Sequence, residues 1–374
     1  GSGKLMPPIM FSGSGYYYND PSFQGSRLAL KYYDTATGQS IYLCARPECL
    51  HDGNEFCNAT SRKSTPCGMT MYEGMLYLNV LEWSFETELR EYKLLRASPD
   101  GTDLSEICAY AKQETAPDGI MTGGAFNPII HRSKAYLDYE LDGDEKVRTL
   151  GIAEVDIFTG LSKTILEVSS NGRINSADVC GDRLFSVLTV PESEDSYKMI
   201  QKLFDYNIST GEMYSEKLPV QLFHDGRAAD GKYVMIGSDG YDARLISYDP
   251  VTREFTDMDN EMSEFFKSDK GGGRTLEYDG TNFYAVKEIL DRVDAYPAAV
   301  FSSDFQKLAE FDIPSYQEQP LFSLDILDGT VYVQGYYRVV CCPVKDILSG
   351  NTRWETAYVF DREADKEFEE NADG

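Results

Sequence analysis

Short apolar runs alternate with polar turns along the whole chain, with a period of about 50 residues. One copy, residues 229–258, reads ADGKYVMIGSDGYDARLISYDPVTREFTDM. Its pattern predicts strands at Tyr233 to Ile236 and Leu245 to Tyr248, joined by a polar loop and followed by a tight turn and a third strand. The recurrence of this unit predicts a repeat protein built from hairpins.

Two turn signatures mark each copy. Asp, Asn and Gly favour tight turns because they tolerate positive φ or hydrogen-bond their own backbone. The first signature is a dipeptide ahead of an aromatic strand, at residues 14–15, 73–74, 132–133, 181–182, 230–231, 279–280 and 328–329. The second is a five-residue turn that begins at Asp34, Ser98, Asp156, Asn207, Asp249, Ser303 and Asp361.

Seven copies with about four strands each predict an all-β fold, a seven-bladed β-propeller of four-stranded antiparallel blades. We interpret residues 1–9 as a tag remnant or leader, 10–367 as a single propeller and 368–374 as an acidic tail. A short helix is expected at Met262 to Lys267. The blades are predicted at about 10–43, 69–109, 127–168, 174–218, 223–258, 275–313 and 322–367.

Composition narrows the classes of partner. The chain has 374 residues, and its 26 Tyr and 19 Phe suit sheets. With 35 basic and 62 acidic residues the net charge is −27, which repels a phosphate backbone and argues against nucleic-acid binding. No apolar run is long enough to span a membrane. We also expect the protein to be a monomer.

The segment from Cys44 to Cys67 leaves the repeat pattern. Cys44, Cys49, His51 and Cys57 offer three sulfurs and one imidazole, the ligand set of a closed structural zinc site. Disulfides among these cysteines and Cys67, or reduced thiols, are the alternatives, and spacing alone leaves the choice open. Because four protein ligands leave no open position, we interpret the loop as a staple and not as an active site.

This loop also carries a resemblance. The sequence LCARPECLHDGNEFCNAT, which follows the DTATG turn, resembles a group of exported propeller lipoproteins from Gram-positive gut anaerobes. The turn in LLRASPDGTDLSEI is similar to that of the YWTD propellers of low-density-lipoprotein receptors, although LYLN at 76–79 replaces the YWTD motif. The resemblance implies a cell-surface protein anchored by a lipid upstream, without enzyme activity. No ligand contact of the receptors carries over.

Candidate binding residues come from the loops between blades and between second and third strands, which share one face of a propeller. We expect the long excursions at 44–67, 111–126, 259–274 and 340–353 on this face. Exposed aromatic residues beside carboxylates suit sugar rings or a protein partner. The candidate binding residues are Trp83, Tyr197, His224, Tyr241, Asp242, Tyr296, Tyr337 and Trp354.

The pattern therefore favours a non-catalytic cell-surface module that binds a glycan or a protein. The alternative is a carbohydrate-active hydrolase or lyase that uses carboxylates at the channel mouth. Only three histidines and no nucleophile motif occur, which favours the first interpretation.

Overall fold

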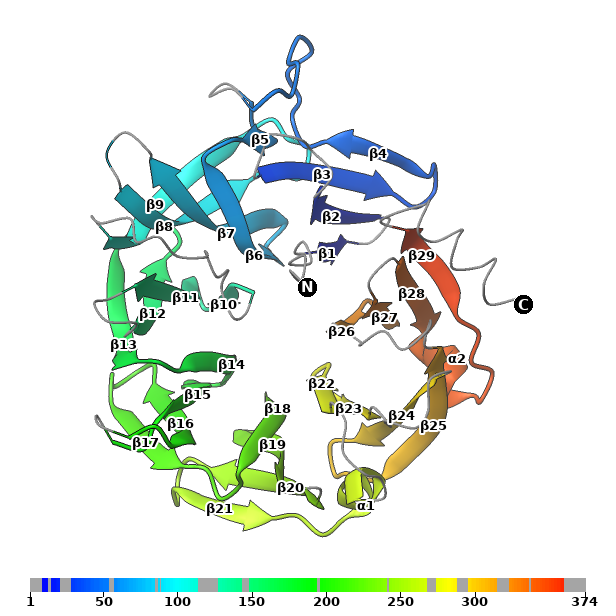
Figure 1. Ribbon diagram of the computed structural model, residues 1–374. Coiled ribbons are helices and arrows are strands. Elements are labelled where there is room, and N and C mark those ends of the chain that lie inside the picture. Colours follow the sequence, from blue (N-terminus) through cyan, green and yellow to red (C-terminus); the bar gives the residue numbers. More distant parts are fainter. Residues whose placement is uncertain are drawn as a thin grey trace. The chain divides into compact units, whose positions relative to one another are not determined.

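The computed structural model (Figure 1) describes seven four-stranded antiparallel sheets, the first extended by a short fifth strand, and confirms the seven-bladed β-propeller. The described residues are 9–12, 15–20, 28–53, 57–84, 87, 89–113, 127–142, 148–193, 196–240, 242–267, 274–287, 295–314, 323–335 and 338–359. The chain divides into two compact units, residues 1–179 with 186–214 and residues 180–185 with 215–374.

In every described sheet four strands that follow one another along the chain form a meander, and in the first sheet β5 also pairs with β3. The first sheet contains β1 (Ile9–Ser12), β2 (Gly15–Asn19), β3 (Leu28–Asp34), β4 (Gln39–Tyr42) and β5 (Thr60–Ser61). The second contains β6 (Ser64–Tyr72), β7 (Met75–Ser84), β8 (Leu89–Ala97) and β9 (Leu104–Gln113). The third contains β10 (Ile129–His131), β11 (Lys134–Asp142), β12 (Arg148–Asp156) and β13 (Ser162–Ser170). The fourth contains β14 (Arg173–Cys180), β15 (Arg183–Pro191), β16 (Met199–Asn207) and β17 (Met213–Lys217).

The remaining three sheets follow the same order. The fifth contains β18 (Leu222–Ala229), β19 (Lys232–Asp239), β20 (Asp242–Asp249) and β21 (Glu254–Asp257). The sixth contains β22 (Arg274–Tyr278), β23 (Asn282–Lys287), β24 (Ala295–Ser302) and β25 (Lys307–Pro314). The seventh contains β26 (Ser323–Leu327), β27 (Thr330–Gln334), β28 (Arg338–Pro343) and β29 (Glu355–Val359). Helix α1 (Glu261–Lys267) confirms the expected short helix, and α2 (Val344–Leu348) follows β28.

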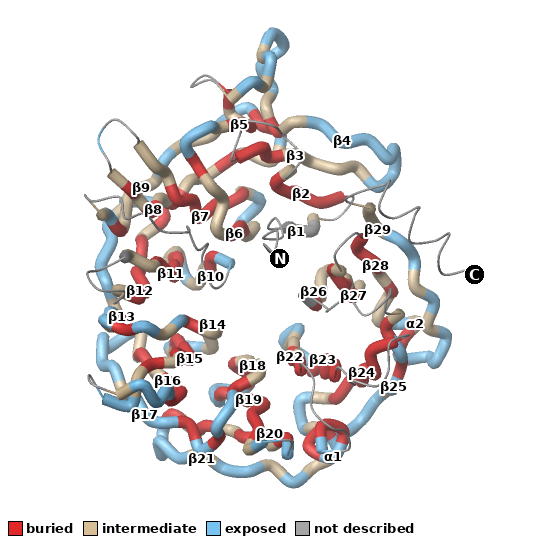
Figure 2. The backbone as a smooth tube through the Cα atoms, viewed as in Figure 1, coloured by how far each residue is buried: buried red, intermediate tan, exposed pale blue. Residues whose placement is uncertain are grey.

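Within each unit neighbouring sheets pack face to face, and this packing buries their middle strands (Figure 2). In one unit, β3 and β7 share a core that includes Leu30 and Leu78. In the other, β19 and β20 pack on β23 and β24, and α1 adds Met262 and Phe266 to the same cluster. Strand β19 is therefore buried from Tyr233 to Ser238, whereas the outermost strands β4 and β21 are largely exposed.

The second turn signature is confirmed in six sheets, where it joins the third strand to the fourth. At Asp34, Asp156, Asn207 and Asp249 the side-chain oxygen accepts backbone N–H groups two and three residues ahead. The residue that closes each of these turns has a positive φ, and it is Gly38, Gly160, Gly211 or Arg253. We call this end of each sheet the turn end, and the end with the loop between second and third strands the loop end.

The seventh sheet departs from this expectation. Its third and fourth strands are joined by α2 and the segment up to Trp354, and the predicted turn at Asp361 lies outside the described residues. The run Val340 to Pro343, expected within a loop insertion, belongs to β28, because its apolar residues continue the strand until Pro343 begins the helix. The insertion therefore lies at the turn end of the seventh sheet and not at its loop end.

Two glycines in equivalent turns allow the contribution of close packing to be measured. Gly160 and Gly211 have φ of +70° and +75°, but a Cβ at Gly160 would lie 2.6 Å from the Ile107 carbonyl oxygen, and a Cβ at Gly211 would meet nothing within 4 Å. We expect Gly211→Ala to lower the free energy of unfolding by about 1 kcal/mol, the cost of the left-handed conformation. Gly160→Ala should cost about 1–3 kcal/mol more through the steric clash. Urea unfolding of both variants measures this difference, and equal losses would contradict the packing of this turn against β9.

Candidate metal centre and binding residues

The loop that carries Cys44, Cys49, His51 and Cys57, which we call the Cys/His loop, interrupts the outer edge of the first sheet. The Leu43 N–H donates to the Leu30 carbonyl (3.0 Å), and the Leu30 N–H donates to the Ala59 carbonyl (2.7 Å). The edge of β3 is therefore paired with β4 up to Lys31 and with β5 from Ala29, so that the chain leaves and rejoins this edge at Leu30. The described residues of the excursion, 44–53 and 57–58, project outward between β4 and β5 (Figure 1). The loop does not start from the loop end of the sheet, as we had expected, because Thr60–Ser61 completes the edge strand after the excursion.

Local turns direct the four candidate ligands toward one another. The Cys49 N–H donates to the Arg46 carbonyl (3.2 Å), which closes a turn directly before the second sulfur. His51 and Gly53 both have positive φ, +51° and +82°, and so reverse the chain after the histidine. The imidazole of His51 stacks on Tyr42 of β4 with ring centroids 4.6 Å apart, which fixes the orientation of the ring.

Cys44, Cys49, His51 and Cys57 form one group, in which the ligand atoms all lie within 4.8 Å of one another. The Cys57 sulfur is 3.5 Å from His51 Nδ1. A tetrahedral zinc with Zn–S near 2.3 Å and Zn–N near 2.0–2.1 Å holds its ligand atoms roughly 3.5–3.8 Å apart. The group could therefore hold a metal ion with only a small contraction.

Hydrogen bonds favour an ionised sulfur in this group. Burial opposes ionisation of Cys44, but hydrogen bonds from the backbone of Arg46 and Asn58 and from the thiols of Cys49 and Cys57 lower its pKa. The pKa of Cys49 is raised to about 11: a hydrogen bond from the His51 backbone opposes the shift, while burial and the neighbouring thiols Cys57 and Cys44 outweigh it. A metal ion binds the deprotonated form of cysteine, so the thiol protons leave when it binds.

The fourth cysteine of the disulfide alternative lies elsewhere. Cys67 belongs to β6 and packs beside Leu81, Tyr92 and Tyr139, in the core between the second and third sheets. Without Cys67 the loop holds three cysteines, of which one disulfide could join only two. The fold therefore brings together Cys44, Cys49 and Cys57 but not Cys67, and it does not support disulfides among all four cysteines. Cys341 and Cys342 occupy successive positions of β28 and so face opposite sides of the sheet.

Three of the predicted binding residues lie at or beside loop ends. Tyr197, between β15 and β16, is fully exposed, and its neighbour Lys198 forms an ion pair with Glu192 (3.0 Å). Asp242 is exposed at the first position of β20. Trp83 is half-buried on β7, where it pairs with Arg90 of β8, whose guanidinium lies 5.1 Å from the centre of the indole ring. Tyr241 and Tyr337 lie outside the described residues.

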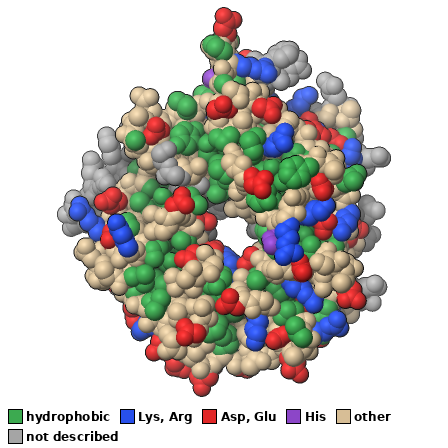
Figure 3. Space-filling model, turned by 180° about the vertical axis from the view of Figure 1, so that it is seen from behind, with side chains coloured by type: hydrophobic (Ala, Val, Ile, Leu, Met, Phe, Trp, Pro, Cys, Tyr) green, Lys and Arg blue, Asp and Glu red, His purple; other side chains and the backbone are tan. Residues whose placement is uncertain are grey.

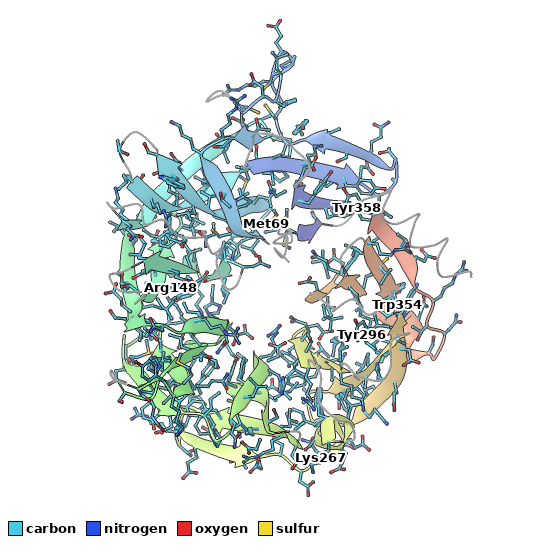
Figure 4. The ribbon with its side chains drawn as sticks, in the orientation of Figure 1. Met69, Arg148, Lys267, Tyr296, Trp354 and Tyr358 are labelled. Carbon is cyan, nitrogen blue, oxygen red and sulfur yellow. The ribbon has the colours of Figure 1, made fainter. Side chains whose placement is uncertain are left out.

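Two other predicted residues are packing groups. Tyr296 is only 7% exposed, because it packs in the core between the sixth sheet, to which β24 belongs, and the seventh sheet. Trp354 precedes β29 at the turn end of the seventh sheet, where its Nε1 donates to the Asp312 carbonyl (2.8 Å) and its ring lies near Phe311. Figure 4 labels both side chains. The expectation that both tryptophans share the loop end is thus wrong for Trp354.

His224 is held as a neutral acceptor on β18. Its Nε2 lies 3.0 Å from Ser238 Oγ and 3.1 Å from Arg274 Nη1. Because a guanidinium can only donate, Nε2 accepts, and burial together with Arg274 lowers the pKa of His224 to about 4. Ser238 is 1% exposed, so this serine and histidine do not form an accessible nucleophile and base.

A charged cluster beside His224 was missed by the sequence analysis. Arg227 donates to Asp225 Oδ1 (2.7 Å) and to both carboxylate oxygens of Glu277 on β22, and Asp225 also accepts the Leu276 N–H (3.0 Å). Burial raises the pKa of Glu277 to about 7 against the opposing effect of Arg227, although 22% of the side chain stays exposed. The available signal was the alternation of charged residues, Asp225 and Arg227, on one face of a predicted strand.

Comparison with known proteins shows the fold alone. No protein-family model matches the chain, and no curated protein matches its sequence. Among solved structures, the tricorn protease aligns over 96% of this chain and 34% of its own (10% identity, TM-score 0.52). The β-propeller domain of the Trilobed protease from Pyrococcus furiosus, described as an open velcro topology, aligns over 75% of this chain and 81% of its own (12% identity, TM-score 0.51).

An acylaminoacyl peptidase from Pyrococcus horikoshii aligns over 78% of this chain and 46% of its own, with 10% identity and a TM-score of 0.51. The chain thus spans less than half the length of the acylaminoacyl peptidases that it matches. Within the described part of the chain, no helix has the length and apolar character needed to cross a membrane.

The state of His224 predicts a pH dependence of stability. The pKa of His224 is lower in the folded protein than the ordinary value of 6.5. Its contribution to the free energy of unfolding is therefore complete above pH 6.5 and is lost as the pH falls toward 4. When the pH falls from 7 to 5, the free energy of unfolding of the unchanged protein should decrease by about 1 kcal/mol more than that of the His224→Gln variant. This value allows for partial exposure of the ring. Urea unfolding at both pH values measures this difference. An identical pH dependence in the variant would contradict the neutral, Arg274-bound histidine.

Proposed function

We propose that this chain is a non-catalytic binding module whose first blade carries a structural zinc centre. The observation that supports the centre is the convergence of Cys44, Cys49, His51 and Cys57, whose ligand atoms lie within 4.8 Å of one another. Three thiolates and one imidazole match zinc, and four protein ligands leave no position for water or substrate. The metal would stabilise a loop that has few apolar contacts of its own.

The binding role rests on the loop ends. Tyr197 presents a fully exposed aromatic ring next in the chain to Lys198, which is ion-paired with Glu192, and such a ring can stack on a sugar ring or anchor a protein surface. Asp242 adds an exposed carboxylate at the loop end of the fifth sheet. A glycan or a protein is therefore the ligand class that we propose, and the chain acts as a monomer.

The cell surface is the proposed location. It rests on the resemblance of the Cys/His loop to exported propeller lipoproteins, in which a lipid anchor lies upstream of the propeller. The net charge of −27 disfavours nucleic acid as a partner, and acidic and basic side chains are interspersed on the face seen in Figure 3.

A carbohydrate-active hydrolase or lyase is the second candidate, and one observation favours it. Glu277, with its pKa raised to about 7, lies near Asp225, and two carboxyl groups with different proton affinities can serve as acid and base. Arg227 binds both carboxylates, however, and this favours a structural role for the cluster.

The zinc centre is tested by metal content. Native protein should contain about one zinc per chain by elemental analysis, and Cys49→Ser or His51→Ala should remove it because three ligands bind zinc far more weakly. Cys67→Ser is the matched control and should retain the metal, since this thiol packs in another cluster. Loss of zinc in Cys67→Ser, or a disulfide between Cys44, Cys49 or Cys57 in native protein, would contradict the proposal.

The binding role is tested on a glycan array and by a hydrolysis screen of the same glycans. We expect binding without turnover, and Tyr197→Ala should weaken it by about 1–3 kcal/mol if the ring is an anchor. Phe158→Ala is the control, because Phe158 is an exposed aromatic residue, 69% accessible, at the turn end of the third sheet. Turnover that Glu277→Gln abolishes would instead support the enzyme.

A further inference from the structure

We infer that the turn between β8 and β9, residues 98–103 of the second sheet, is an outer clamp of the metal centre and that Gly101 positions its ligands. This inference rests on the proposed zinc centre. It assigns a role in metal affinity to a residue that is not a ligand and that comes from a different sheet.

The carbonyl of Gly101 holds both ends of the Cys/His loop. It accepts the N–H of Ala45 (3.0 Å) and the side-chain Nδ2 of Asn58 (3.0 Å), which also donates to the Thr102 carbonyl (3.3 Å). Ala45 follows the first candidate ligand, Cys44, and Asn58 follows the last, Cys57. One oxygen atom of the second sheet therefore fixes the distance between the two ends of the ligand set.

Asn58 also contributes to the centre through its backbone. It directly follows the last candidate ligand, Cys57, so its backbone connects this ligand to the turn of the second sheet. Its side-chain amide is occupied by the carbonyls of Gly101 and Thr102.

The contact has no room for a side chain. Gly101 is buried and has a φ of +72°, and a Cβ there would lie 2.5 Å from the Leu43 carbonyl carbon and 2.6 Å from the Cys44 nitrogen. Glycine is required here both for the left-handed backbone and for the approach to the residue that carries the first ligand. A larger residue must displace either the turn or Cys44.

The turn itself is held firmly. Ser98 and Thr102 hydrogen-bond across it (3.1 Å), Tyr17 of β2 donates to the Pro99 carbonyl (3.3 Å), and Ala97 and Leu104 pack in the core between the first and second sheets. Since the turn is fixed to both sheets, it can hold the ends of the loop in place. Metal binding and the docking of this turn should therefore stabilise each other.

The test measures zinc affinity by competition with a chromophoric chelator. Gly101→Ala should bind zinc about 10–100-fold more weakly than the unchanged chain, the range typical for loss of an outer-shell partner. Gly211→Ala is the matched control, because its φ of +75° imposes the same backbone strain while a Cβ would meet nothing within 4 Å. Its zinc affinity should be unchanged.

A milder pair of variants covers the case in which Gly101→Ala does not fold. Asn58→Ala removes only the side-chain bonds to Gly101 and Thr102 and should weaken zinc binding about 10-fold. Asn175→Ala, which removes a bond to Thr189 Oγ1 in the fourth sheet, should leave the affinity unchanged. In the unchanged chain, zinc removal should also speed hydrogen exchange in residues 98–103 but not in the turn at 207–211.

Equal zinc affinities for Asn58→Ala and Asn175→Ala, with exchange at 98–103 insensitive to zinc, would overturn the clamp and leave the zinc centre standing. An unchanged chain that binds no zinc would overturn the proposed centre and the clamp together.

Discussion

Face-to-face packing of four-stranded sheets is the constraint on which the rest of this structure depends. Within each unit this packing buries the middle strands, so β19 is buried from Tyr233 to Ser238 and β24 from Ala295 to Phe301, whereas β4 and β21 can be polar. The buried strands leave function to the sheet ends and edges. The proposed metal centre at the edge of the first sheet and the proposed binding residue Tyr197 at the loop end of the fourth sheet are both placed in this way.

The blades were predictable because their turns carry specific chemistry. An Asp or Asn oxygen that caps two backbone N–H groups, followed by a residue with positive φ, can be read directly from the sequence at Asp34, Asp156 and Asn207. The seventh sheet broke the pattern because α2 and the segment up to Trp354 join its third and fourth strands, and the predicted turn at Asp361 lies outside the described residues. The sequence contains no local signal that distinguishes a turn from such a connection.

The ligand set was predictable from residue type, but its place in the fold was not. The two-residue strand Thr60–Ser61 restores the interrupted edge, and so short a strand has no detectable period. The role of Gly101 was also hidden, because it arises from an approach between residues that are far apart in the chain. Tyr296 and Trp354 were predicted as binding residues because they lie near predicted loops, but both are packing groups in the fold.

Zinc K-edge X-ray absorption of the purified chain would test the central claim most directly. A closed centre formed by Cys44, Cys49, His51 and Cys57 predicts about three sulfur neighbours near 2.3 Å and one nitrogen near 2.0–2.1 Å. An inner shell dominated by oxygen, or one with two sulfurs and a water ligand, would contradict a closed structural site at the edge of the first sheet.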